Sequence, residues 1–271
     1  MSSLDRPSTV ASLTSTVNPP DERFLGLMNP PEYSRWLTSL VKLLGSACLA
    51  RATFSPNASK DETLGPLSPA LGALRDLQRW KESLPQFLQP EATDTTTPCY
   101  IRPILLLEVQ YHYAVVVLTR SALLQHATAA SSGLRWPGPL CEGPQTLSDE
   151  CRTSGASLCR ALVKMQESIC FDSVTGFDMF YGITGASILA LDLVIMLREG
   201  TDHTEISSLL KNMAMLAEKH LHNHKMPGSL HKLATRISEL PGIVWSGNSV
   251  LANEKIQCNV LARQQRRIKS Q

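Results

Sequence analysis

Apolar residues recur at steps of three and four positions through seven separate segments of this chain of 271 residues. In the segment from Glu32 to about Leu49, for example, Tyr33, Trp36 and Leu40 fall on one stripe of a helix. The other six segments are Ser68 to Leu84, Pro103 to about Gln125, Ser148 to Ile169, Val174 to Arg198, Asp202 to about Met226 and Ser229 to Leu240. The sequence therefore predicts an all-α fold, with about seven helices in a single irregular helical domain with long loops.

Four residues are predicted to mark helix ends. Ser68 and Ser148 carry side chains that cap helix N-termini, and Pro103 is expected in the first turn of the third helix. Gly200 suits the left-handed position at which many helices end. Residues 90–99, rich in Thr and Pro, are expected to form a loop.

Three regions are expected along the chain. Residues 1–22 indicate a flexible N-terminal segment, residues 23–245 the helical domain, and residues 246–271 a basic C-terminal tail. Within the domain, residues 127–147 are rich in Ala, Ser, Gly and Pro, which predicts a mobile loop.

The charge is nearly balanced, with 26 Lys and Arg against 24 Asp and Glu and a formal net charge of +2. This balance excludes a globally basic nucleic-acid-binding protein. A local basic patch remains in the tail, formed by Arg263, Arg266, Arg267 and Lys269. These four side chains are candidates for phosphate contacts or a nuclear address, and the alternative is a merely solvated basic end.

The seven cysteines are scattered and include no Cys-x-x-Cys pair. That spacing argues against a zinc ribbon and against a dense disulfide framework, and it favours a reducing, intracellular compartment. Cys151 and Cys159 could share one helix face, but the sequence supplies no base beside them. We expect no catalytic residue, no cofactor and no metal.

The weak metal candidates are His220 and His224, which belong to an alternating run with His222. On a helix His220 and His224 lie one turn apart and could share a metal ion. The alternative is that these are solvated histidines near a helix C-terminus, where the helix dipole favours cationic side chains.

Two apolar stretches resemble membrane spans, Ile104–Leu124 and Phe180–Leu197. The second contains a single charge, Asp192, and a charge at mid-membrane costs about 2.5–3.5 kcal/mol. Gly182 and Gly185 suit close helix packing in water or in lipid. We expect buried helices and no membrane, with a membrane span as the alternative.

Two tryptophans, Trp36 and Trp80, lie on predicted helix stripes. Core packing is the expected role of both, and an effector pocket is the alternative.

The order of three segments resembles a known family. Leu71–Pro85 carries spaced leucines, a tryptophan at Trp80 and a final Leu-Pro, and Leu105–Arg120 carries Tyr111-His112 near its centre. A helix that starts at a cysteine follows, and then the sequence YGITGASILAL from residue 181. Over about residues 25–245, this order resembles the C-terminal half of the regulatory "middle homology" domain of fungal-specific transcription factors.

The chain departs from that family in two respects. Its cysteines do not supply the binuclear zinc cluster, and no Arg-Arg-x-x-Trp-Trp-type helix represents the first half of the regulatory domain. The chain thus resembles a truncated member, and it would reach DNA only indirectly or through a missing N-terminal zinc cluster.

The resemblance implies a non-enzymatic regulator in the nucleus that controls transcription of metabolic or biosynthetic genes, including secondary metabolism. It would act through a small-molecule effector, a protein partner or a homo-oligomer rather than by direct base readout. Two alternatives stay open: an all-α enzyme of small-molecule metabolism and a membrane-associated helical protein.

Overall fold

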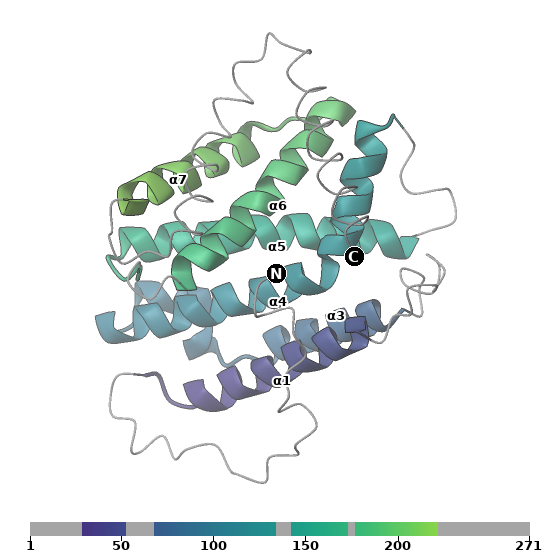
Figure 1. Ribbon diagram of the computed structural model, residues 1–271. Helices are drawn as coiled ribbons and strands as arrows, with labels where there is room; N and C mark the ends of the chain where they lie inside the picture. Colours follow the sequence, from purple (N-terminus) through teal and green to yellow (C-terminus); the bar gives the residue numbers. More distant parts are fainter. Residues whose placement is uncertain (1–28, 53–67, 134–141, 173–176, 222–271) are drawn as a thin grey trace, which may run out of the picture.

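The computed structural model describes residues 29–52, 68–133, 142–172 and 177–221 (Figure 1). Within these ranges the secondary structure is helical, with no strand. The α-helices are α1 (Tyr33–Ala52), α3 (Pro69–Glu82), α4 (Pro98–Ser131), α5 (Glu142–Glu167), α6 (Phe177–Glu199) and α7 (Thr204–Leu221). The described part therefore confirms the all-α prediction with six of the helices, and the expected helix at 229–240 lies outside it.

The long helix α4 lies at the centre and separates two apolar cores (Figure 1). On one side, Leu107 and Tyr111 of α4 pack with α1 and α3. On the other side, Leu105 and Val109 of α4 pack with α5, α6 and α7. Because α4 is buried on both sides, its sequence is apolar all round, as expected for a core helix.

Helix α3 forms where the local signals predict it. The Ser68 side chain accepts a hydrogen bond from the Leu71 N–H at 3.3 Å, and Pro69 occupies the first turn. The helix ends at Glu82, shortly before Pro85, which cannot continue it. The predicted N-cap at Ser68 is therefore confirmed.

Helix α4 is longer than predicted at both ends. It begins at Pro98, so Pro103 lies inside the helix, and it continues to Ser131 rather than to Gln125. Pro103 is the sixth residue of the helix, and its missing N–H removes one intrahelical bond, the one to the carbonyl of Cys99. The chain before α4 also differs from the predicted loop at 90–99, because Pro90–Asp94 (η5) is a 3-10 helix that follows a second one at Gln86–Leu88 (η4).

The expected loop at 127–147 is also shorter than predicted, because its two ends are helical. Residues 127–131 belong to α4 and residues 142–147 belong to α5, which has Pro144 in its first turn. Ser148 consequently does not cap a helix. It lies inside α5, where its buried hydroxyl hydrogen-bonds to His126.

Helices α5 and α6 approach each other closely through glycines. A Cβ added to Gly185 would lie 2.5 Å from the Sγ of Cys159, and one added to Gly155 would lie 2.3 Å from Cγ2 of Ile188. The predicted role of Gly185 in close packing is confirmed, and Gly155 makes a further contact of the same kind. Gly200 has φ +68° after α6, which confirms the predicted helix end.

Two of these helices, α4 and α6, are long and apolar enough to cross a membrane by length and composition. About half of each apolar stretch, 56% in α4 and 50% in α6, is buried among the other helices. Core helices of water-soluble proteins pass the same test, so the observation is weak support for a membrane span. The predicted N-terminal segment at 1–22 and the tail at 246–271 lie outside the described residues.

Candidate functional site

The most distinctive polar site of the described chain surrounds two tryptophans between α1, α3 and α4. The indole of Trp80 stacks on the ring of Tyr111, with ring centroids 5.9 Å apart and planes at 14°. The edge of Trp36 contacts Trp80 with a centroid distance of 6.0 Å. We use the name tryptophan cluster for Trp36, Trp80, Lys81, Glu108, Tyr111 and His112. The core role predicted for both tryptophans is confirmed, since Trp80 is buried and Trp36 packs against the same core.

The two indole N–H groups of this cluster differ in their hydrogen bonding. Trp80 Nε1 donates to the hydroxyl of Ser39 at 2.7 Å. Trp36 Nε1 is also buried but has no hydrogen-bond partner among the described residues. A buried donor that lacks a partner costs about 1–3 kcal/mol, so Trp36 carries unused binding capacity.

Glu108 holds the charged side of the cluster together. One carboxylate oxygen forms an ion pair with the Lys81 ammonium, and the other lies 2.9 Å from Nε2 of His112. The Lys81 ammonium also lies over the Tyr111 ring, 5.2 Å from its centroid. Burial lowers the Lys81 pKa to about 8, with Glu91 opposing the shift, so Lys81 remains mostly charged at neutral pH.

His112 is neutral in this environment, and its tautomer follows from its neighbour. Burial, aided by the nearby Lys81 charge, lowers the His112 pKa to about 3. A carboxylate can only accept, so Nε2 carries the proton and donates to Glu108. Nδ1 is then a buried acceptor, and it has no partner in the described part of the chain. The cluster thus offers one unpaired donor, on Trp36, and one unpaired acceptor, on His112.

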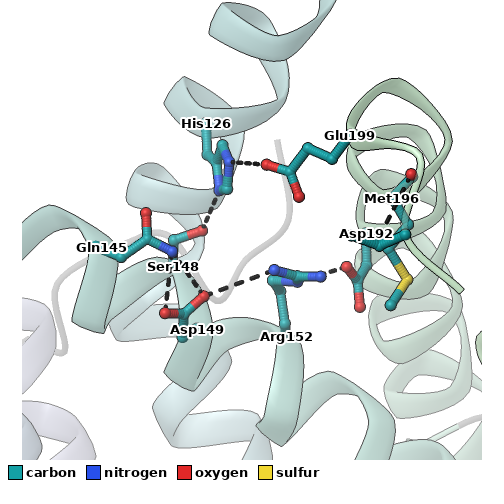
Figure 2. Close-up of polar contacts among 9 residues, drawn as sticks. His126, Gln145, Ser148, Asp149, Arg152, Asp192, Met196 and Glu199 are labelled. Carbon is teal, nitrogen blue, oxygen red and sulfur yellow. Dashed lines mark hydrogen bonds and ion pairs between the residues drawn. The ribbon is translucent and has the colours of Figure 1, made fainter. Parts of the chain in front are cut away.

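A second polar network connects the C-terminal part of α4 to α5 and α6 (Figure 2). His126 Nδ1 lies 2.9 Å from the Ser148 hydroxyl, and His126 Nε2 lies 3.2 Å from a carboxylate oxygen of Glu199. Beside it, Arg152 pairs with buried Asp192 at 2.5 Å and with Asp149 at 3.6 Å. Burial raises the Asp192 pKa, and the Arg152 charge opposes that rise.

The contacts of His126 have the order serine, histidine, glutamate, which hydrolases use to activate a serine nucleophile. The Glu199 carboxylate can only accept, so Nε2 donates to it; Nδ1 then accepts from the Ser148 hydroxyl when the ring is neutral and donates to the hydroxyl oxygen when the ring is protonated. Ser148 is 0% exposed, however, so a substrate carbonyl cannot approach its oxygen. These hydrogen bonds therefore link α4, α5 and α6 to one another.

The structure places only part of the predicted metal and basic sites. His220 lies near the end of α7, where it hydrogen-bonds to Gln166 at 2.8 Å and stacks on Phe171. His222, His224 and the basic residues Arg263, Arg266, Arg267 and Lys269 lie outside the described residues. Among the residues that are described, no group of three or more His, Cys, Asp or Glu side chains could hold a metal ion.

The two cysteines considered as possible nucleophiles, Cys151 and Cys159, are buried and unreactive. Both Cys151 and Cys159 are 0% exposed in α5. Burial raises the pKa of the Cys151 thiol to about 12 and raises that of Cys159 as well. A thiol is nucleophilic only as its thiolate, so neither group suits catalysis near neutral pH.

The polar network around His126 was missed by sequence reasoning. One signal for it was present: Asp192 is the single charge in the apolar stretch Phe180–Leu197, and a buried carboxylate needs a partner. Nothing in the sequence identified Arg152 as that partner, because the two residues meet only through the packing of α5 on α6.

Comparison of the chain with models of protein families, with curated proteins and with solved structures found no match.

Proposed function

We propose that this chain is a non-enzymatic regulator of transcription that acts through effector or partner binding. Its described part is a helical domain, as the resemblance to the regulatory domain of fungal-specific transcription factors implies. In this proposal residues 23–245 form the regulatory-type domain, and the protein works in the nucleus on metabolic or biosynthetic genes. It reaches DNA only indirectly, through a partner, or through a missing N-terminal zinc cluster.

The observation that supports this proposal best is the composition of the tryptophan cluster. Trp80 lies in the first segment that carries the resemblance, and Tyr111 and His112 lie in the second. The two segments form different helices, α3 and α4, yet Trp80 of α3 stacks on Tyr111 of α4, and the ring of His112 contacts Tyr111 edge-on. If the resemblance were an accident of composition, its residues would not need to share a site.

The cluster also suggests how an effector would act. It joins α1 and α3 to the central helix α4 through Trp36, Trp80 and Tyr111. Both unpaired atoms are buried, so an effector would pair with Trp36 Nε1 or with His112 Nδ1 only in an arrangement of the helices that exposes it, and the pairing would remove the cost of leaving that atom unpaired. It would thereby favour the arrangement of α1 and α3 that it binds, at the expense of other arrangements.

Two measurements on the full chain test the proposal. A fluorescent tag is expected to place the protein in the nucleus. The chain fused to an unrelated DNA-binding domain is expected to change transcription of a reporter carrying that domain's site, whereas the fusion carrying Tyr111→Ala changes it less. Met215→Ser, at an exposed position of α7, serves as the matched control and is expected to behave as the wild type.

Two results would contradict the proposal together: a fusion that transcribes the reporter no differently from the DNA-binding domain alone, and a tagged protein that stays outside the nucleus.

A further inference from the structure

An apolar corner lies where α5 ends, α6 begins and α7 ends. We use this name for Ile169, Phe171 and Phe177. Ile169 is 93% exposed and Phe177 is 65% exposed, although both are large apolar side chains. Phe171 is half-buried and packs against the core residues Met179 and Leu216. The exposed side chains of the corner therefore lie next to the buried core, to which Phe171 connects them.

Ile169 has a backbone conformation that its side chain disfavours. Its φ is +55°, in the left-handed region where glycine is the usual residue and a β-branched side chain is an outlier. The conformation ends α5 in a Schellman motif, with Cys170 N–H bonded to Met165 O at 2.9 Å and Ile169 N–H bonded to Gln166 O at 3.1 Å. An isoleucine here is both strained and exposed, and such outliers gather at sites of function.

The connection that carries Ile169 is held firmly in place. Asp178 is fully buried at the start of α6 and pairs with Arg102 of α4 at 2.9 Å. The same carboxylate accepts the backbone N–H of Asp172 at 2.7 Å. Arg102 also donates to the carbonyl oxygen of Cys170. These bonds fix the residues beside Ile169, so the apolar side chain is presented in a defined position.

Helix α7 delivers the rest of the chain to this corner. His220, in its last turn, stacks on Phe171 with ring centroids 4.9 Å apart and hydrogen-bonds to Gln166 of α5. Residues 222–271 follow directly. Within them, Leu230, Leu233, Ile237 and Leu240 recur at helical spacing, and Pro227-Gly228 stands just before them as a signal for a change of direction.

We propose that residues 229–240 pack their apolar face on the corner formed by Ile169, Phe171 and Phe177 of the same chain. The connection from Leu221 to Ser229 can span up to about 26 Å at full extension, which is enough to return to the corner from the end of α7. The contact buries the exposed side chains of Ile169 and Phe177. The left-handed backbone of Ile169 then serves to hold its side chain against the docked segment. The contact also removes from water the apolar side chains that recur at helical spacing in the sequence of 229–240.

A photo-crosslinker tests which segment covers the corner. Benzoylphenylalanine replaces Ile169 in the full chain, and mass spectrometry locates the crosslink after irradiation. Crosslinks to residues 229–240 within one chain are expected. Crosslinks between two chains would overturn the proposal in favour of a second copy as the occupant, and their absence would overturn it by showing that the corner is uncovered.

Limited trypsin digestion of the full chain gives an independent test, because Lys232 and Arg236 lie within the proposed docking segment. Phe177→Ser is expected to speed cleavage at these two sites about tenfold, since it removes apolar contact area that holds the segment. Ile169→Asn, which tolerates the left-handed backbone, is expected to act in the same direction. Val41→Ser on the distant helix α1 is the control and is expected to leave the rate unchanged. Equal cleavage rates in the wild type and both corner variants would contradict the proposal.

Discussion

The indole of Trp80 stacks on the phenol ring of Tyr111, with centroids 5.9 Å apart and planes only 14° apart. This contact joins α3 to the central helix α4. It also joins two of the sequence segments on which the proposed resemblance to a fungal regulatory domain rests. Because Trp36 and the ion pair between Glu108 and Lys81 adjoin the same stack, the site combines core packing with polar groups that lack partners among the described residues.

The two tryptophans are predicted to respond differently to the same substitution. Trp80→Phe loses the hydrogen bond to Ser39 and leaves a gap in the core, so it should lower the free energy of unfolding by about 2 kcal/mol. Trp36→Phe removes a donor that has no partner in the described structure and should cost under about 1 kcal/mol. Urea unfolding of both variants measures the difference, and equal losses would contradict the assignment of unused binding capacity to Trp36.

The stability of the protein is predicted to fall with acid through His112. Its pKa is about 3 when folded and about 6.5 when unfolded, so between these values the unfolded chain binds more protons. The contribution of His112 to the free energy of unfolding is therefore fully present above about pH 6.5. It is lost as the pH falls toward 3, by at most about 1.4 kcal/mol per pH unit.

The His112→Gln variant isolates this effect, because glutamine does not titrate. Urea unfolding between pH 7.5 and pH 4 should show a shallower decline for the variant than for the wild type. Parallel declines in the two proteins would show that His112 is charged in the folded state, contrary to the environment described.

Close packing of α5 on α6 predicts opposite effects for two glycine substitutions. Gly155→Ala would place a Cβ 2.3 Å from Cγ2 of Ile188, so we expect it to lower the free energy of unfolding by about 1–3 kcal/mol. Gly72→Ala in α3 is the matched control, because no atom lies within 4 Å of its added Cβ. It should stabilise the protein by about 0.5–1 kcal/mol. Thermal unfolding distinguishes the two, and an unharmed Gly155→Ala protein would contradict the close approach.

The ion pair between Arg152 and Asp192 predicts a non-additive pair of substitutions. Arg152→Leu leaves the Asp192 carboxylate buried without its partner, at a cost of about 3 kcal/mol. Asp192→Leu in the same chain should restore most of that loss, because two apolar side chains can replace a buried ion pair. A double-mutant cycle by urea unfolding measures the coupling, and purely additive losses would show that the pair is not a unit.

Local signals predicted some helix boundaries well and others poorly. Ser68, Pro69 and Pro85 determine α3 through interactions within the segment itself, so the sequence sufficed there. The start of α4 was misplaced because two prolines, Pro98 and Pro103, both suit a helix start, and local signals do not decide between them. Ser148 was misread for a similar reason, since its place in α5 depends on His126 from another helix.

The candidate site was predictable only in its parts. The helix stripes identified Trp36 and Trp80 as inward-facing residues, and the structure confirms their place in the core. The ion pair between Lys81 and Glu108 has no sequence signature, because it arises where α3 and α4 come together. The contact between Glu108 and His112 joins positions one turn apart in α4, but nothing in the sequence shows that the other nitrogen of His112 is buried without a partner among the described residues. Residues far apart in the sequence meet through tertiary packing, which periodicity does not specify.

The central claim, regulation of transcription without catalysis, is tested most directly by the transcript profile of cells that lack this protein. The profile should change for a limited set of metabolic or biosynthetic genes. Re-expression of the wild-type chain should restore it, and the Tyr111→Ala chain at equal abundance should not. An unchanged profile after loss of the protein, or full restoration by Tyr111→Ala, would contradict the account.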